Sequence, residues 1–197
     1  IMAIDSGVTI NCVDLQAPGG IKQILLRSWA DTDLISYANA GVSPNGEHLI
    51  TSISSGGIGT ASWFNYDFKN QEPSMTINGT KENGSTQFEV GLSFTLPKMD
   101  TNKFHQVQAM LRECIMAIVI DSNGVPFVIG VSELYRNEAV AARSQTFANI
   151  ATIEGGTGAA YNDDNGITVT LMAKQYELPR VYTGTIVLTG TDGATTT

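Results

Sequence analysis

Gln87-Phe-Glu-Val-Gly-Leu-Ser-Phe-Thr-Leu96 carries the clearest structural pattern in the sequence. Its apolar residues, from Phe88 to Leu96, occupy every second position, and small or polar residues lie between them. Successive side chains of an extended strand point to opposite faces of a sheet. This period of two therefore predicts a long strand with one buried face and one polar face.

Further strands are indicated on both sides of this stretch. Residues 167–173 alternate in the same way, although Met172 interrupts the polar face, while 115–120 and 125–131 are nearly all apolar. Continuous apolar runs of this length are typical of strands that are covered on both faces, so the second pair predicts a central hairpin. Shorter strand candidates lie at 8–12, 63–68 and 182–188.

Asn-Gly dipeptides recur between these segments. This dipeptide is the strongest short hairpin signal, because a tight primed turn requires positive φ at both central residues. The sequence therefore predicts turns at five places: Asn45-Gly46, Asn78-Gly79, Asn83-Gly84, Asn123-Gly124 and Asn165-Gly166.

One segment has the spacing of an amphipathic helix. Apolar residues follow one another at intervals of three, four and three, and Asp100 or Thr101 can cap the free amides at the start. We expect a helix over about 98–114 that lies across the sheet core through Phe104, Val107, Leu111 and Cys114. Residues 133–143 are compatible with either a second short helix or a strand that enters a loop.

Together these patterns predict a mainly β fold, an antiparallel β-sandwich or barrel with one flanking helix and extended arms or loops. Residues 1–45 are interpreted as an N-terminal arm with the first strands, and 46–189 as the β domain. Residues 190–197 contain little that can be buried and are expected to form a flexible tail.

The composition limits the function classes. The 197 residues include 42% hydrophobic residues, 11 Lys+Arg, 19 Asp+Glu and two cysteines, for a net charge of −8. These values exclude a disordered chain, a disulfide-dense scaffold and a basic nucleic-acid binder. Charged residues make up 15% of the chain, against about 25% in an ordinary soluble domain. A surface with so few charges favours a subunit that faces other copies.

The sequence contains no motif that predicts a catalytic or metal site. His48 and His105 are interpreted as surface residues, and Cys12 and Cys114 as small buried hydrophobes, because no nucleophile elbow or metal-ligand spacing accompanies them. Asp163-Asp164-Asn165-Gly166 lacks the ligand positions of a calcium loop. We therefore expect no catalytic residues, no metal, no cofactor and no enzyme activity.

No membrane span is expected, because no apolar run approaches about 20 residues. The segment from Met2 to Ser6 lacks the basic start and apolar block of a signal peptide, which predicts a protein made in the cytoplasm.

The segment from Ile115 to Tyr182 has a distinctive order of features. An apolar hairpin with the turn Asp121-Ser-Asn-Gly124 is followed by the Gly-rich Ala151-Thr-Ile-Glu-Gly-Gly-Thr-Gly158. Next come the strand led by Asp163-Asp-Asn-Gly166 and the Pro-containing Glu177-Leu-Pro-Arg-Val-Tyr182. This order resembles the tail-tube (major tail) proteins of tailed bacteriophages. The resemblance covers about a third of the chain and rests on turn and strand patterning.

The resemblance implies a virion structural protein that assembles edge to edge into rings, commonly hexameric, which stack into a tube. The implied partners are copies of itself, other phage tail proteins and viral DNA that passes through the lumen without specific binding. The implied location is the virion tail, after synthesis in the host bacterial cytoplasm. The acidic balance fits, because carboxylates in a lumen repel phosphate.

Two pliable Gly-rich loops, together with both termini, are the predicted contact regions between subunits. They are poor in charge and do not have the strand, third glycine or lysine of a phosphate cradle. The candidate contact residues are Gly56, Gly57, Gly59, Gly155, Gly156 and Gly158.

The alternative function is a β-sandwich binding module, such as a receptor- or carbohydrate-binding virion appendage. Trp63, Tyr66 and Tyr161 would then form a ligand platform. Packing of these aromatics in the core or in an interface is the competing and favoured interpretation.

Overall fold

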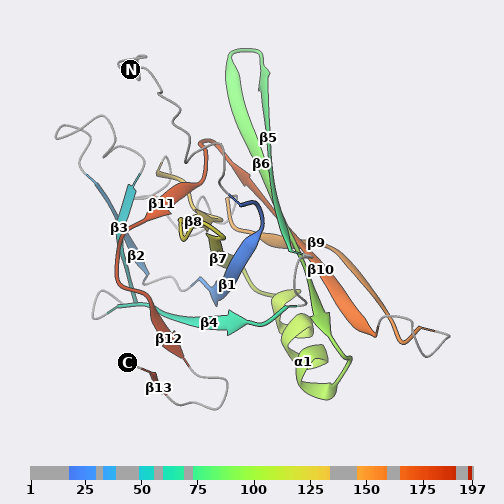
Figure 1. Ribbon diagram of the computed structural model, residues 1–197. Helices are drawn as coiled ribbons and strands as arrows, with labels where there is room; N and C mark the ends of the chain where they lie inside the picture. Colours follow the sequence, from blue (N-terminus) through green and yellow to red (C-terminus); the bar gives the residue numbers. More distant parts are fainter. Residues whose placement is uncertain are drawn as a thin grey trace.

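The structure, a computed structural model, describes residues 18–29, 33–38, 49–55, 60–68, 73–133, 146–158, 165–189 and 195–196. Within these ranges the chain forms thirteen strands and one α-helix, arranged in a nine-stranded and a four-stranded sheet (Figure 1). The predicted mainly β fold with one helix is confirmed.

The larger sheet has the order β13-β12-β4-β1-β7-β8-β11-β3-β2. It is mixed rather than wholly antiparallel, because β11 runs parallel to β3 and β12 runs parallel to β4. Its strands are β1 (Ile21–Ser28), β2 (Leu34–Tyr37), β3 (Leu49–Ser54), β4 (Ser62–Tyr66), β7 (Ile115–Asp121), β8 (Pro126–Ile129), β11 (Arg180–Tyr182), β12 (Val187–Thr189) and β13 (Thr195–Thr196).

The smaller sheet is antiparallel throughout, in the order β5-β6-β10-β9. Its strands are β5 (Ser74–Glu82), β6 (Ser85–Pro97), β9 (Asn149–Gly156) and β10 (Gly166–Gln175). β6 contains the stretch that predicted a long strand, and the β5–β6 hairpin extends beyond the body of the molecule (Figure 1).

The main core lies between the two sheets. Val90, Leu92, Phe94 and Leu96 of β6 are buried there, and so are the alternating residues of β10 from Ile167 to Ala173. The period-two predictions for both strands are confirmed.

The nine-stranded sheet curls around a second core on its other side. Alternate residues of β7 serve the two cores: Ala117 and Val119 face the first, and Met116 and Ile118 pack in the second with Trp63. The predicted central hairpin covered on both faces therefore exists as β7–β8.

The helix α1 (Thr101–Met110) is shorter than predicted. It begins after Asp100, whose Oδ1 accepts a hydrogen bond from the Lys103 amide at 2.9 Å, so the predicted cap is confirmed. Its buried residues are Val107 and Met110, whereas Phe104 and Leu111 are 55% and 50% exposed. The predicted contact face was thus wrong at these two positions, because a helix of three turns touches the sandwich over little more than its last turn.

The Asn-Gly turns have mixed outcomes. Asn83-Gly84 joins β5 to β6 with φ of 49° and 83°, and Asn123-Gly124 lies between β7 and β8, so these two predictions are confirmed. Asn78-Gly79 is instead part of β5. Residue 166 begins β10, where its partners are Pro97 and Gly156, so no hairpin turn is formed there. Asn45-Gly46 lies outside the described residues.

Other segments differ from the expected divisions. β1 and β2, within the predicted N-terminal segment, are hydrogen-bonded into the nine-stranded sheet. Residues 182–188 contribute to two short strands, β11 and β12, rather than one. In the predicted tail, Thr195 and Thr196 pair with β12. The strand candidate 8–12 and the segment 134–143 lie outside the described residues.

Candidate functional site

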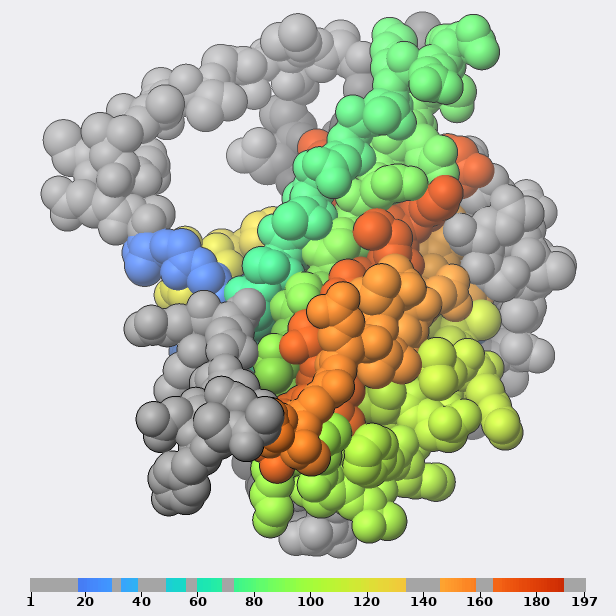
Figure 2. All heavy atoms as spheres, turned by 90° about the vertical axis from the view of Figure 1, so that its right-hand side faces the viewer, coloured from blue at the N-terminus to red at the C-terminus, as the bar shows by residue number. Residues whose placement is uncertain are grey.

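The four-stranded sheet has one buried face and one open face. Residues between the core-facing positions carry mainly hydroxyl and amide side chains, and Figure 2 shows β5, β6, β10 and β9 side by side on this face. The hydroxyl groups interact across strands: Thr95 and Thr168 lie 2.9 Å apart, and Thr170 Oγ1 donates to Ser93 Oγ at 3.4 Å. The sequence therefore builds a hydrophilic wall on the back of the core.

The charges on this open face are few. Glu89 and Lys174, on neighbouring strands, form a salt bridge of 3.5 Å. Glu154 of β9 shares the face, since it pairs with Thr168. The wall is thus mostly neutral with a small acidic excess.

The two edges of this sheet have no further strand beside them in the described part of the chain. On the core side of each edge strand lies an exposed isoleucine: Ile77 of β5 is 42% exposed and Ile153 of β9 is 40% exposed. Unpaired edges expose backbone donors and acceptors and are ready to pair with another chain.

Sequence reasoning missed both isoleucines. Asn78-Gly79 suggested a turn directly after Ile77, and the Gly-rich segment that follows Ile153 and includes Gly155 and Gly158 was expected to be a pliable loop. The alternation of Met75-Thr-Ile77 and of Ala151-Thr-Ile153 was the signal that marks both segments as strands.

The predicted contact glycines are only partly placed. Gly56, Gly57 and Gly59 lie outside the described residues. Gly155 and Gly156 belong to β9 and pair with Ile167 and Gly166, so this part of the predicted loop is a strand. A Cβ on Gly155 would approach the Gly166 carbonyl oxygen to 3.2 Å, which explains why a residue without a side chain fits there. Gly158 follows the strand with a φ of 70°.

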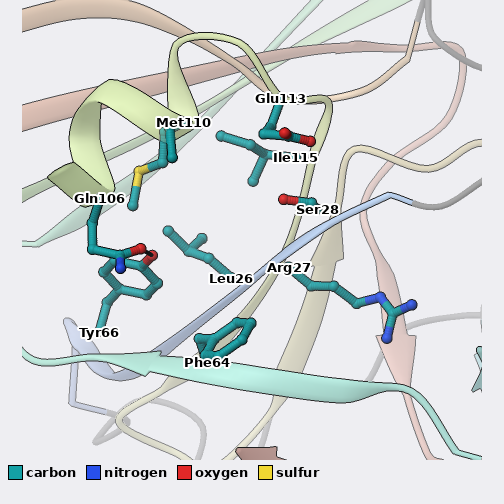
Figure 3. A pocket seen from close by; sticks show the side chains of 10 residues that line it. Leu26, Arg27, Ser28, Phe64, Tyr66, Gln106, Met110, Glu113 and Ile115 are labelled. Carbon is teal, nitrogen blue, oxygen red and sulfur yellow. Dashed lines mark hydrogen bonds between the residues drawn. The ribbon is translucent and has the colours of Figure 1, made fainter. Parts of the chain in front are cut away.

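A pocket of about 90 Å³ lies between α1 and the nine-stranded sheet (Figure 3). Tyr66 Oη donates to Gln106 Oε1 at 3.3 Å across it, and Phe64, Leu26 and Met110 complete its apolar lining. A neighbouring hollow of about 300 Å³ shares Phe64, Tyr66 and Gln106. Burial raises the pKa of Tyr66, so the phenol stays protonated and acts as a hydrogen-bond donor.

Two charged residues, Arg27 and Glu113, line this pocket. Arg27 points away from it (Figure 3), and its Nη2 donates to the two oxygens of Asp33 at 2.6 and 2.7 Å. A similar cluster ties Arg180 of β11 to Glu133 and Glu177. Both arginines are buried, so these ion pairs hold strands and loops together.

Nucleophilic and metal-ligating groups are not brought together in the described ranges. His105 is exposed on α1, and burial, followed by the charge of Glu113, raises the pKa of the Cys114 thiol, which disfavours the reactive thiolate. No group of three or more potential metal ligands occurs among these residues. His48 and Cys12 lie outside them. No helix found there has the length and apolar character to cross a bilayer.

The aromatic platform is not assembled as the binding-module alternative requires. Trp63 is fully buried in the second core, so core packing is confirmed for this residue. Tyr66 is partly buried against Phe94, at 6.4 Å between ring centroids. Tyr161 lies outside the described residues.

Comparison with family models, with curated proteins and with solved structures gives no match.

Proposed function

We propose that this chain is a virion structural protein, a tail-tube subunit that assembles into stacked rings around a conduit for DNA. The observation that carries the proposal is the four-stranded antiparallel sheet with two open edges and one polar face. No catalytic or metal chemistry is needed for this role.

The topology of the sheet suits it to join head to tail with copies of itself. Four antiparallel strands alternate in direction, so β5 and β9 run in opposite directions. When copies are related by rotation, β9 of one therefore meets β5 of the next in antiparallel pairing, and the polar face continues from copy to copy. Such a heterologous contact closes into a ring when the rotation permits.

The dimensions of such a ring fit a DNA conduit. A ring of six copies, the number implied by the resemblance to tail-tube proteins, would contain a barrel of 24 strands. With strands about 4.8 Å apart and tilted by about 40°, its backbone diameter is roughly 50 Å. This leaves an opening wider than a DNA duplex once the side chains are counted.

The open face has the chemistry that a conduit requires. Hydroxyl side chains with one lysine, which is paired to Glu89, offer little attraction to phosphate. Binding of DNA gains most of its affinity from phosphate contacts with Lys and Arg. A wall without free cations lets DNA pass without being held. We accordingly place the protein in the virion tail, in contact with its own copies and with other tail proteins.

The first test is the particle that purified protein forms. Negative-stain micrographs should show rings or tubes with a central opening, and sedimentation should show assemblies that grow with concentration. A protein that stays monomeric over a wide range of concentration contradicts the proposal.

A second test maps the lumen. Thr170→Cys places a thiol on the open face, and Thr51→Cys places a matched thiol on an exposed position of β3. With a maleimide attached to a protein too wide for the opening, we expect both to react in monomers and only Thr51→Cys to react in polymers. Unprotected Thr170→Cys in polymers would place the open face outside. Unsubstituted protein gives the background from Cys12 and Cys114.

A further inference from the structure

Ile77 and Ile153 occupy equivalent places at opposite edges of the four-stranded sheet. Each belongs to the row of side chains that faces the core, and the residues beside them in those rows, Val90 and Val169, are fully buried. The edge strands therefore reach beyond the nine-stranded sheet, and each carries one large apolar side chain into solvent. Burial of both against each other would remove this exposed surface from water.

The backbone of β5 at Ile77 faces the open edge. The φ values of 49° at Asn83 and 83° at Gly84 define a type I′ turn, which is closed by a hydrogen-bonded pair of Glu82 and Ser85. Hydrogen-bonded and non-bonded pairs alternate along an antiparallel ladder. Glu82–Ser85 is a hydrogen-bonded pair, so the alternation along β5 makes Ile77–Val90, five residues further from the turn, a non-bonded pair. The backbone N–H and C=O of Ile77 therefore point away from β6, toward the free edge of the sheet.

The same counting applies to β9. The Lys98 amide donates to the Asn165 carbonyl at 2.7 Å, which sets the alternation between β6 and β10. By this alternation, the backbone N–H and C=O of Thr168 point away from β6 and toward β9, where Thr168 is paired with Glu154. Ile153, the next residue, therefore directs its N–H and C=O to the free edge, with its side chain on the same face as that of Ile77.

We propose that, in the ring, Ile153 on β9 of one copy lies directly opposite Ile77 on β5 of the next. This register rests on the proposed assembly and specifies its joint. The partner is a second copy of this chain, held by backbone hydrogen bonds and by an isoleucine pair on the outer side of the barrel wall.

The strand geometry agrees with this register. Within one copy, Ile153 is paired with Val169, Val169 with Phe94, and Phe94 lies opposite residue 73, just before β5. If Ile153 pairs instead with Ile77 of the next copy, that copy is shifted along the strand direction by four residues for every four strands of the barrel. At about 3.3 Å per residue and 4.8 Å per strand, this corresponds to a tilt of about 35°, within the usual range for barrels.

Other registers fit less well. Without displacement Ile153 would meet Pro73, which has no N–H to donate. Displacement by four residues in the other sense would carry Ile153 past the first residue of β5. In the proposed register Met75 lies opposite Gly155, and the glycine leaves room for the larger side chain.

The test uses single cysteines in a background with Cys12→Ser and Cys114→Ser. Ile77→Cys and Ile153→Cys proteins are mixed under assembly conditions and oxidised. We expect a cross-linked dimer from the mixture, little from either protein alone, and a ladder of higher species from the double variant. Met75→Cys mixed with Ile153→Cys is the matched control, two residues out of register, and should give roughly ten-fold less dimer because its Cα atoms lie beyond disulfide reach.

The outcomes distinguish the proposed contact between copies from the proposed tube. A cross-linked dimer formed by the Ile77→Cys protein alone, or by the Ile153→Cys protein alone, would show that copies meet by two-fold symmetry and would overturn the register. Tubes in micrographs without the mixed dimer would also overturn it, while the proposed function stands. The mixed dimer in protein that forms no rings or tubes would support the joint and contradict the tube. Neither tubes nor dimer would overturn both.

Discussion

Phe94 gives the most direct test of the two-sheet sandwich. Its ring lies between the sheets, 1% exposed, and makes an edge contact with Tyr66. A phenylalanine side chain that buries roughly 200 Å² of apolar surface contributes up to about 5 kcal/mol to the free energy of unfolding. Because the surrounding strands cannot close the cavity fully, Phe94→Ala should lower the free energy of unfolding by about 3–5 kcal/mol.

Phe64 is the matched control, since it is the same residue type on a strand of the other sheet and is 49% exposed. Phe64→Ala should cost about 1 kcal/mol, because half of the ring is already in water and no closed cavity is left. Urea unfolding of the monomer measures both. With an m-value of roughly 2 kcal/mol/M, the midpoint should fall by about 2 M for Phe94→Ala and by about 0.5 M for Phe64→Ala. Equal shifts would refute the burial of Phe94 between two sheets.

Three further results are expected. Arg180→Met should lower stability by about 2–3 kcal/mol in urea unfolding, because the partly buried Glu133 and Glu177 lose their shared cation; a neutral effect would contradict the cluster. Gly84→Val should lower the thermal midpoint and leave a β5–β6 hairpin that is cut faster by protease, since φ is 83° there; unchanged cleavage would argue against the primed turn. The hydrogen bond from the Lys103 amide lowers the pKa of Asp100, so its contribution to stability is present above the unfolded pKa and is lost as pH falls through the folded one. Below about pH 4 the thermal midpoint should therefore drop more for the natural protein than for Asp100→Asn, whose cap is uncharged; parallel pH profiles would contradict this.

The strands were predictable where one face is uniformly apolar. Residues 88–96 and 167–173 alternate with one interruption on the polar side, at Met172. Burial follows the alternation closely in β10 and over most of β6, where Gly91 is also buried. The cap of α1 was predictable because a short acidic side chain before a helix satisfies free amides. These features depend on neighbours in sequence, which the sequence displays directly.

The edges of the sheets were not predictable in this way. Asn78-Gly79 has the composition of a turn, but pairing with Glu89 and Phe88 on β6 keeps it extended, and the Phe88 ring occupies the space where a Cβ on Gly79 would lie. Whether a strand has neighbours on both sides is decided by tertiary pairing, which leaves no local signature. The sequence alone therefore could not identify Ile77 and Ile153 as edge residues.

The position of β11 has a consequence for the timing of folding. This strand lies between β8 and β3 and joins the β2–β3 hairpin to the rest of its sheet, although Val181 and its partner Leu49 are separated by most of the chain. β10, which holds β9 in the smaller sheet, also belongs to the last part of the sequence. A chain still emerging from the ribosome therefore has neither sheet complete, and long-range pairings of this kind form slowly. Until β10 and β11 are made, strand edges and apolar surface stay exposed on the nascent chain, which favours wrong pairing before synthesis ends.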